Sequence, residues 1–439
     1  MPAADLDDEV VELARALIQV DTSNPPGNET PAAELLAAYL RGAGIEPELI
    51  GPDPQRLNLV ARIAGRGEGP SLMLMGHTDV VPAPVAGWTV PPFEAALRDG
   101  LLLGRGASDM KGELAARAVA FATLARRGEA PAGDVVLVAE ADEERNTADV
   151  GMSWLVRERP DLACDFALNE GGGLLLELAD GRRAVTVAVG EKRAGSLRIR
   201  LFGTAGHASV PAAADNPLRY VAAAIDRLLA YETPARVDAA TERTLEVLGS
   251  TGGGEDAIAR AGALHPVLAQ TLPVTVRTVV TPTGVQSFEP ANVIPPYADV
   301  ICDCRSLPAE REAEVRAHVD RALGDGFAYE VEFLEPLAGG TESGIDTPLY
   351  RACEEYVAER LPGAVLLPLI GPGFSNSYWV RKAWGSAAYG FAPVFATDPD
   401  VYLDGAHGAD EALAVADLVE MTRFALHAID ALPLRAADG

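Results

Sequence analysis

The chain has 439 residues, of which 48% are hydrophobic, so it is long enough for two domains with full cores and too apolar for a disordered protein. Its formal net charge of −28 argues against nucleic acids and anionic membranes as partners. No run approaches the roughly 18 consecutive apolar residues of a membrane span, and the acidic first residues lead us to expect no secretory signal. Four cysteines without C-x-x-C spacing indicate a reduced, cytoplasmic protein.

The first part of the chain alternates helices with strands. Apolar residues at helical spacing predict a helix over 10–17, and Thr30 followed by Pro31 predicts the start of a second helix. A third helix is expected after Gly112. The strand-like runs lie near 57–63, 71–76, 134–139 and 165–169. This alternation predicts an α/β fold with a mostly parallel, helix-covered sheet.

After about residue 190 the pattern changes to that of an antiparallel sheet with one wet face. The alternating runs lie at 196–202, 275–280 and 298–304, and the helices that would cover the other face lie near 216–231 and 308–323. Residues 191–336 are therefore predicted to form a smaller α+β domain, inserted into a catalytic domain of residues 1–190 and 337–439. Within the insert, 235–272 is expected to add helices and a flexible loop.

Histidine or acidic side chains follow the predicted strands of the larger domain. They are His77 and Asp79, Asp109, Glu143 and Glu144, and Glu170, and a late His407 completes the set. Ligands of open α/β sheets bind beyond the carboxyl ends of the strands, so we expect these groups to converge. Two histidines with several carboxylates and no thiolates indicate a hydrolytic zinc site rather than a structural one.

Several short motifs occur in an order that is typical of one known family. They are Asp21–Gly27, Gly76–Asp79, Gly104–Gly112, Asp142–Glu144, Asn169–Gly171, Gly206–Ser209 and His407–Glu411. Over nearly the whole chain they resemble the di-zinc metallopeptidases of clan MH, the family of glutamate carboxypeptidase, aminoacylase and succinyl-diaminopimelate desuccinylase. The resemblance implies a cis peptide between Asp109 and Met110. It also implies a lid domain that often forms a dimer, so we expect a homodimer, with a monomer as the alternative if 235–272 covers that surface.

The resemblance also implies which residues hold metal. It implies two zinc ions, with cobalt or manganese as substitutes, and places His77 and Glu170 on one ion and Glu144 and His407 on the other. Asp109 is the shared ligand, because two ions roughly 3.5–4 Å apart require a carboxylate between them. The sequence leaves open which ligand serves which ion.

Asp79 and Glu143 are expected to act beside the metals. Side chains two positions apart on a strand share a face, so Asp79 is better placed to fix the tautomer of His77 than to bind metal. The adjacent Glu143 and Glu144 should point in different directions. By the resemblance, Glu143 is the general base that takes a proton from water and delivers it to the leaving amine. The alternatives are a cap role for Asp79 and a solvated acidic turn for 142–144.

Three residues of the inserted domain match residues that contact substrate in the family. His207 would polarise the scissile carbonyl, often from the neighbouring subunit. Asn292 and Arg305 would hold the substrate carboxylate, for which the fork of an arginine is suited. The alternatives are a turn histidine, a strand-end cap and a surface ion pair. Where relatives commonly read Thr–Asp–x–Arg, this chain has Ser375–Tyr378, which indicates a more neutral and apolar pocket.

These features predict a zinc-dependent amidohydrolase that acts on a small peptide or an N-acyl amino acid and cleaves its amide bond beside a free carboxylate. The alternative at the same site is a desuccinylase- or deacetylase-like enzyme that acts on a metabolic intermediate. A non-catalytic metal-fold binding protein would be expected to lack a ligand or the base, and none is missing. A serine hydrolase is disfavoured because the chain has no G-x-S-x-G motif.

Overall fold

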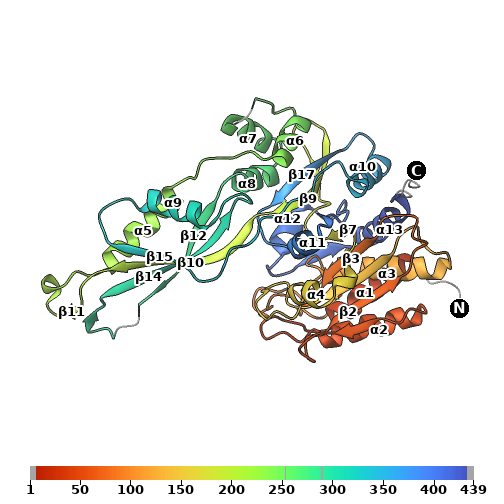
Figure 1. The fold of residues 1–439 in the computed structure, drawn as a ribbon, viewed down its shortest axis with the longest axis horizontal. Coiled ribbons are helices and arrows are strands. Elements are labelled where there is room, and N and C mark those ends of the chain that lie inside the picture. The colour runs from red at the N-terminus through yellow and green to blue at the C-terminus, as the bar shows by residue number, and fades with distance from the viewer. Residues whose placement is uncertain (1–5, 253, 288–289, 433–439) are drawn as a thin grey trace. The chain divides into compact units, whose positions relative to one another are not determined.

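The computed structural model describes residues 6–252, 254–287 and 290–432. The chain divides into two compact units. Unit 1 consists of the chain up to Val189, of Ser343–Leu369 and of the residues from Ser375 onward. Unit 2 consists of Gly190–Glu342 and Ile370–Phe374. Figure 1 labels many of the helices and strands of both units.

Unit 1 is built on a mixed sheet of nine strands in the order β1-β2-β6-β3-β7-β18-β9-β17, with β8 beside β9. The strands are β1 (Glu48–Ile50), β2 (Asn58–Ile63), β3 (Leu72–His77), β6 (Val135–Glu140), β7 (Phe166–Asn169), β8 (Leu175–Glu177), β9 (Arg183–Glu191), β17 (Val365–Gly371) and β18 (Ala387–Gly390). The central strands β6, β3, β7 and β18 are parallel, whereas β1, β2 and β9 pair antiparallel with their neighbours. The predicted α/β fold with a parallel sheet centre is confirmed, and the antiparallel flanks were not predicted.

Helices cover both faces of this sheet. They are α1 (Leu6–Ile18), α2 (Thr30–Gly42), α3 (Lys111–Arg127), α4 (Met152–Glu158), α10 (Pro348–Arg360), α11 (Ser377–Trp384), α12 (Pro399–Gly405) and α13 (Val415–Ala431). Met73 and Met75 of β3 share a buried cluster with Leu155 of α4 and Val380 of α11. Gly76 faces the opposite way, where a Cβ would meet Met110 at 3.0 Å. Glycine at this position therefore lets α3 approach β3 closely.

Unit 1 also contains a separate, smaller sheet. It is formed by β4 (Ala96–Arg98), β5 (Leu101–Leu103) and β19 (Ala412–Ala414) in the order β19-β5-β4. Through it the segment that precedes Asp109 pairs with the segment that follows His407. Residues about 300 positions apart are thereby brought to one place.

Unit 2 is an antiparallel sheet of five strands in the order β12-β14-β10-β15, with β16 beside β10. These strands are β10 (Arg193–Phe202), β12 (Val279–Gln286), β14 (Tyr297–Ser306), β15 (Tyr329–Phe333) and β16 (Ala338–Gly339). The helices are α5 (Leu218–Ala230), α6 (Ala239–Val247), α7 (Gly254–Gly262), α8 (Pro266–Thr275) and α9 (Glu312–Leu323). Figure 1 shows α5 and α9 side by side along this sheet. A two-stranded ribbon, β11 (Gly206–His207) with β13 (Val293–Ile294), also belongs to unit 2.

The two faces of the unit 2 sheet differ as the alternating sequence predicts. Ile199 of β10 and Cys302 of β14 are buried with Val319 of α9. The opposite face carries Arg198, which pairs with Glu332.

One strand prediction for unit 2 was wrong. Residues 275–278 are not extended, because α8 continues to Thr275 and β12 begins only at Val279. The guanidinium of Arg277 donates to the carbonyls of Thr233 (3.1 Å) and Pro273 (3.3 Å), which fixes a turn at this point. An alternating run of only six residues does not distinguish such a turn from a strand.

Among the described residues, no helix combines the length and the apolar content that crossing a bilayer requires.

Candidate metal centre

The fold gathers the predicted ligands at one edge of the unit 1 sheet. His77 is the last residue of β3, Glu170 directly follows β7, and Glu144 lies in the loop after β6. These three strands are parallel neighbours, so their carboxyl ends meet at the same edge. Asp109 comes directly before Met110 and α3, and His407 follows α12. The peptide between Asp109 and Met110 is cis, as the resemblance predicts.

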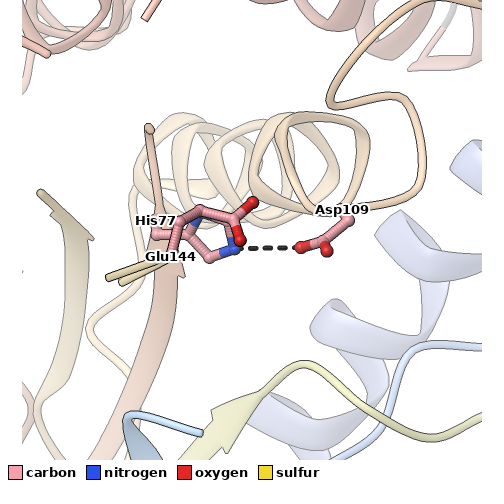
Figure 2. Close-up of side chains that lie close together, drawn as sticks. All are labelled: His77, Asp109 and Glu144. Atoms are coloured by element: carbon pink, nitrogen blue, oxygen red, sulfur yellow. Dashed lines mark hydrogen bonds and ion pairs between the residues drawn. The ribbon is translucent and has the colours of Figure 1, made fainter. Parts of the chain in front are cut away.

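Asp109 lies between the two histidines. Its Oδ1 is 3.1 Å from Nε2 of His77, and its Oδ2 is 3.2 Å from Nε2 of His407. Glu170 Oε2 is 3.3 Å from the His77 nitrogen, and Glu144 Oε2 is 3.1 Å from the His407 nitrogen. Figure 2 shows the His77 ring and the Asp109 carboxylate facing each other, with Glu144 beside the ring. Each half of the site thus has one imidazole and one carboxylate of its own, and Asp109 is common to both.

Glu143 joins the same cluster from the other side. Its carboxylate forms a group with His77 and Glu170 in which the potential ligand atoms lie within 4.8 Å of one another, and His77, Asp109 and Glu144 form a second such group. Six of the sequence-derived site residues therefore converge within unit 1: His77, Asp109, Glu143, Glu144, Glu170 and His407.

The electrostatics of the cluster favour a bound cation. Burial, followed by repulsion from Glu170, raises the pKa of Glu143 well above its usual value. Burial also raises the pKa of Glu144 to about 7, although a hydrogen bond with His407 opposes this. Hydrogen bonds with Asp109 and Glu144 raise the pKa of His407 to about 10. Divalent metal ions would take the place of these protons, because their ligands are ionised carboxylates and neutral imidazoles. The donor set therefore fits a pair of divalent cations.

Asp79 contacts His77 through its backbone carbonyl as well as through the carboxylate that strand alternation predicts. The His77 Nδ1 lies 2.9 Å from the backbone carbonyl oxygen of Asp79 and 3.5 Å from its carboxylate. A neutral imidazole that donates through Nδ1 leaves the Nε2 lone pair directed at Asp109, which is the tautomer a metal requires. The Asp79 carboxylate also accepts from the backbone N–H groups of Glu143 (3.1 Å) and Glu144 (3.2 Å). Asp79 thus holds both the His77 ring and the loop that carries the two glutamates.

A chain of buried polar residues supports this loop. Asn24 donates from one amide nitrogen to Asp79 and to Asp142, at 2.9 Å in each case. Asp142, which directly precedes Glu143, has a left-handed φ of 60° and also pairs with the guanidinium of Arg56 at 3.0 Å. No role was predicted for Arg56 from the sequence. Asn24 and Asp142 lie within motifs of the resemblance, but no role was predicted for either.

The three predicted substrate residues lie in unit 2. His207 is exposed, and its Nδ1 accepts from the backbone N–H (3.1 Å) and the hydroxyl (2.7 Å) of Ser209. The backbone carbonyl of Asn292 accepts from Ala208 at 3.0 Å, so Asn292 lies next to His207. Arg305 is near the far end of β14, where its Nε donates to the carboxylate of Asp303 at 2.9 Å. Unit 2 therefore brings His207 and Asn292 together and holds Arg305 apart from them.

The segment in which this chain departs from the family pattern packs inside unit 1. Asn376 and Tyr378 are 1% and 7% exposed. Ser377 accepts through its hydroxyl from the side chain of Asn169 at 3.2 Å, and Asn169 directly precedes Glu170. This segment therefore supports the end of β7 from within the unit.

The chain is similar to known peptidases and hydrolases. A family model described as "Peptidase family M20/M25/M40" matches residues 73–431. Succinyl-diaminopimelate desuccinylase of Gluconacetobacter diazotrophicus is 38% identical over 225 residues, which is 50% of this chain and 55% of that enzyme. The chain thus spans about half the length of this relative. The mouse N-fatty-acyl-amino acid synthase/hydrolase PM20D1 is 26% identical over 94% of this chain and 86% of its own length.

The similarity extends to solved structures. The M20 family metallo-carboxypeptidase Sso-CP2 from Sulfolobus solfataricus superposes with a TM-score of 0.72, covering 97% of this chain and 99% of that one. At 17% sequence identity this likeness establishes a shared fold.

Proposed function

Because the chain belongs to the peptidase family M20/M25/M40, we propose that it is a zinc-dependent hydrolase that cleaves a peptide or N-acyl-amino-acid amide bond beside a free carboxylate. The observation that carries the proposal is the position of Asp109, whose two carboxylate oxygens face His77 at 3.1 Å and His407 at 3.2 Å. A carboxylate shared in this way is what two ions roughly 3.5–4 Å apart need.

We assign His77 and Glu170 to one ion, Glu144 and His407 to the other, and Asp109 to both. Imidazole nitrogens and carboxylate oxygens without thiolates suit catalytic zinc, and cobalt or manganese are the expected substitutes. When bound, the two ions supply Lewis acidity that polarises the scissile carbonyl and lowers the pKa of water. The protein's own contribution is to hold these five side chains at fixed positions on a rigid sheet edge.

Glu143 is proposed as the general base. Burial and the neighbouring Glu170 raise its pKa, so this carboxylate readily accepts a proton. It takes the proton from the attacking water and delivers it to the nitrogen of the leaving amine. Asp79 holds its backbone N–H at 3.1 Å, which limits the positions that the Glu143 carboxylate can adopt.

Residues of unit 2 and the names of the relatives support the proposed substrate class. Arg305 is proposed to bind the substrate carboxylate. Asn292 and His207, which unit 2 holds apart from Arg305, are proposed to reach the same substrate from the neighbouring subunit, Asn292 at the carboxylate and His207 as a donor to the scissile carbonyl. The relatives are named a desuccinylase and an N-fatty-acyl-amino acid synthase/hydrolase, and these names support an N-acyl amino acid as substrate. A desuccinylase-like activity on a metabolic intermediate is the second candidate, because the desuccinylase is 38% identical in the matched half of the chain.

Unit 2 is proposed to act as a lid and to form a homodimer of a cytoplasmic enzyme. A reduced compartment suits the four cysteines, which are all buried and free. Light scattering measures the mass of the assembly. If His207 acts on the neighbouring subunit, mixing His207→Ala protein with Glu143→Gln protein should restore activity. No recovery after confirmed subunit exchange would contradict action between subunits.

A substrate and metal screen tests the proposed reaction. Metal-free protein is reconstituted with zinc, cobalt or manganese, and its metal content is measured on the same preparation. Dipeptides, N-acetyl, N-succinyl and longer N-acyl amino acids are then compared with their carboxyl-amidated forms. We expect hydrolysis of a free-carboxylate substrate that requires two equivalents of metal. Full activity in metal-free protein would contradict the proposal, and N-succinyl substrates as the sole ones cleaved would favour the second candidate.

A further inference from the structure

Glu411 is a fully buried carboxylate that belongs to neither group of potential metal ligands. Its Oε1 accepts from the backbone N–H groups of Ser108 (2.7 Å) and Asp109 (2.9 Å) and from the Ser108 hydroxyl (2.9 Å). Its Oε2 accepts from the backbone N–H of Gly106 at 2.8 Å and from the guanidinium of Arg105 at 2.7 Å. One side chain therefore fixes the whole segment that ends at Asp109.

Arg105 extends this contact to the other ligand loop. While one of its terminal nitrogens bonds Glu411, the other donates to the backbone carbonyl of Gly408 at 2.6 Å. Gly408 directly follows His407. The Arg105 side chain is 2% exposed and its guanidinium lies 5.3 Å from the ring of Trp88, so solvent does not compete for these bonds.

The two loops that Glu411 and Arg105 join both have demanding backbone conformations. Gly106 has a φ of 92°, and a Cβ there would meet Val80 and Lys111 at 3.0 Å. His407 has a φ of 62°, in the left-handed region that a residue with a side chain rarely adopts. A Cβ on Gly408 would lie 2.2 Å from the carbonyl oxygen of Asp404. Such conformations persist only where the surroundings hold them. Glu411 bonds the first of these turns directly, and Arg105, which Glu411 holds, bonds the second at Gly408.

We infer that Glu411 is a positioning residue which, through Arg105, sets Asp109 and His407 relative to each other. The inference rests on the proposed function, in which these two residues and Glu144 hold one of the two ions. Glu144 and Glu143 depend on a different support, because their backbone N–H groups bond Asp79. Loss of the Glu411 carboxylate should therefore disturb Asp109 and His407, and so weaken binding of the ion that His407 and Glu144 hold more than binding of the ion that His77 and Glu170 hold.

Asp417 provides a matched control within unit 1. It is also fully buried, and its carboxylate accepts from the backbone N–H groups of Phe395, Ala396 and Thr397, each at 2.8 Å. It also accepts from the Thr397 hydroxyl at 2.6 Å. Asp417 thus organises a loop through the same kind of bonds, but none of these bonds reaches a proposed metal ligand. A variant of Asp417 should loosen the fold without changing metal binding.

The experiment is a titration of metal-free protein with Co²⁺, followed by visible absorption and by direct measurement of bound metal. It compares the wild type, Glu411→Gln, Glu411→Asp and Asp417→Asn, with thermal unfolding of each metal-free form. His77→Ala and His407→Ala serve as references that show which position each spectrum reports. Ser108→Ala, which removes one hydrogen bond and keeps the charge of Glu411, is included in case Glu411→Gln does not fold.

We expect the wild type to bind two equivalents. In Glu411→Gln the half-saturation concentration of the second equivalent should rise about 10–100-fold, the usual cost of losing a residue that orients a metal ligand. With one equivalent of Co²⁺ bound, the visible spectrum of Glu411→Gln should match that of His407→Ala. Glu411→Asp should recover part of the loss, and Ser108→Ala should show a smaller shift in the same direction. Asp417→Asn should lower the unfolding temperature and still bind two equivalents as tightly as the wild type.

Three results would overturn the inference while leaving the proposed function intact. They are two equivalents bound by Glu411→Gln as tightly as by the wild type, an equal weakening of both equivalents, and the same weakening of the second equivalent in Asp417→Asn. A wild-type protein that binds no pair of metal ions would overturn the proposed function itself.

Discussion

Arginine–carboxylate pairs occur in both units of this protein, but in opposite settings. In unit 1, the side chain of Arg56 is 8% exposed and bonds the fully buried Glu29 through both of its carboxylate oxygens. In unit 2, Arg198 pairs with Glu332 on the open face of the sheet, where their side chains are 28% and 55% exposed. The residue types are the same, and the exposure differs.

The difference shows what a pair contributes beyond its own attraction. A solvated pair contributes roughly 0–1 kcal/mol, because water and salt screen it. A buried pair, if one partner is removed, leaves an unpaired charge in a poorly solvating interior and costs far more. In unit 1 the buried pairs also hold loops. Arg56 bonds Asp142, next to Glu143, and Arg105 bonds Glu411, which holds the backbone of Asp109. The buried pairs of unit 1 therefore also support the loops that carry the proposed site residues.

The largest expected effect is on catalysis, and the substitution that tests it leaves every buried ion pair of unit 1 intact. Glu143→Gln should lower kcat by roughly 10²–10⁴-fold, because it removes proton transfer while sparing the proposed metal ligands. Metal content and unfolding temperature should stay at the wild-type level. Comparable turnover in a metal-replete variant would rule out Glu143 as the base. His77→Ala is the contrasting variant and should lower the metal stoichiometry.

Arg56→Met breaks a buried pair of unit 1. It leaves Glu29 and Asp142 without their cation, and we expect a loss of roughly 3–5 kcal/mol in the free energy of unfolding. The four tryptophans, Trp88, Trp154, Trp379 and Trp384, all belong to unit 1, so their fluorescence in urea measures its unfolding. Burial already raises the pKa of Glu29, and loss of Arg56 raises it further. The penalty should therefore shrink as the pH falls and the carboxyl takes up a proton.

Arg305→Ala tests a charged residue of unit 2 that is proposed to act on substrate rather than on the fold. Losing a bidentate contact with a partly desolvated carboxylate should cost roughly 2–5 kcal/mol, so kcat/KM should fall by tens-fold or more. Carboxyl-amidated substrates should be affected far less. An equal loss for both substrate forms would mean that Arg305, which bonds Asp303, supports the sheet instead.

The comparison also separates what the sequence predicts from what it does not. The proposed metal ligands stand at the ends of apolar strands, so the order of strands and motifs was enough to predict that they converge. For Asp79, alternation predicted a carboxylate facing His77, and that carboxylate lies 3.5 Å from the ring nitrogen. The chain leaves the strand after His77, so the backbone carbonyl of Asp79 lies nearer the ring, and this contact was not predicted.

The buried ion pairs that support the site had no comparable pattern in the sequence. Arg56 and Glu29 are 27 positions apart, and Arg105 and Glu411 are 306 apart. A charged residue in a sequence is normally solvated, and only the three-dimensional fold shows which of these side chains are enclosed. Periodicity describes which face of an element is buried, but it does not say which distant loops meet there.

A smaller effect distinguishes the two faces of the unit 2 sheet. Burial raises the pKa of Cys302 to about 12, whereas an unfolded thiol ionises near 8.5. Between these values the unfolded state has lost a proton that the folded state keeps, so the free energy of unfolding falls as the pH rises. One such thiol accounts for about 1 kcal/mol between pH 7 and 9.5.

We expect urea unfolding of Cys302→Ala, followed by circular dichroism, to show a shallower fall over this pH range than the wild type. Burial lowers the pKa of Lys192 to about 8, so this residue makes the free energy of unfolding rise with pH. Its contribution is the same in both proteins and cancels in the difference between them. Identical slopes would mean that the Cys302 thiol is not shielded from solvent by α9.

The smallest effect is expected for the open face of the same sheet. Arg198→Ala should change the free energy of unfolding by roughly 0–1 kcal/mol, and 1 M salt should reduce that change further, because screening acts on solvated charges. Urea unfolding followed by circular dichroism at two salt concentrations measures both. Glu332→Ala and the double variant complete a cycle that isolates the pair from other effects of each substitution. A coupling above about 2 kcal/mol, unaffected by salt, would mean that this face is covered in solution. In that event Arg198 and Glu332 would be buried in solution, as Arg56 and Glu29 are, but by a partner that covers this face of unit 2. Arg198 would then mark the surface at which to look for that partner.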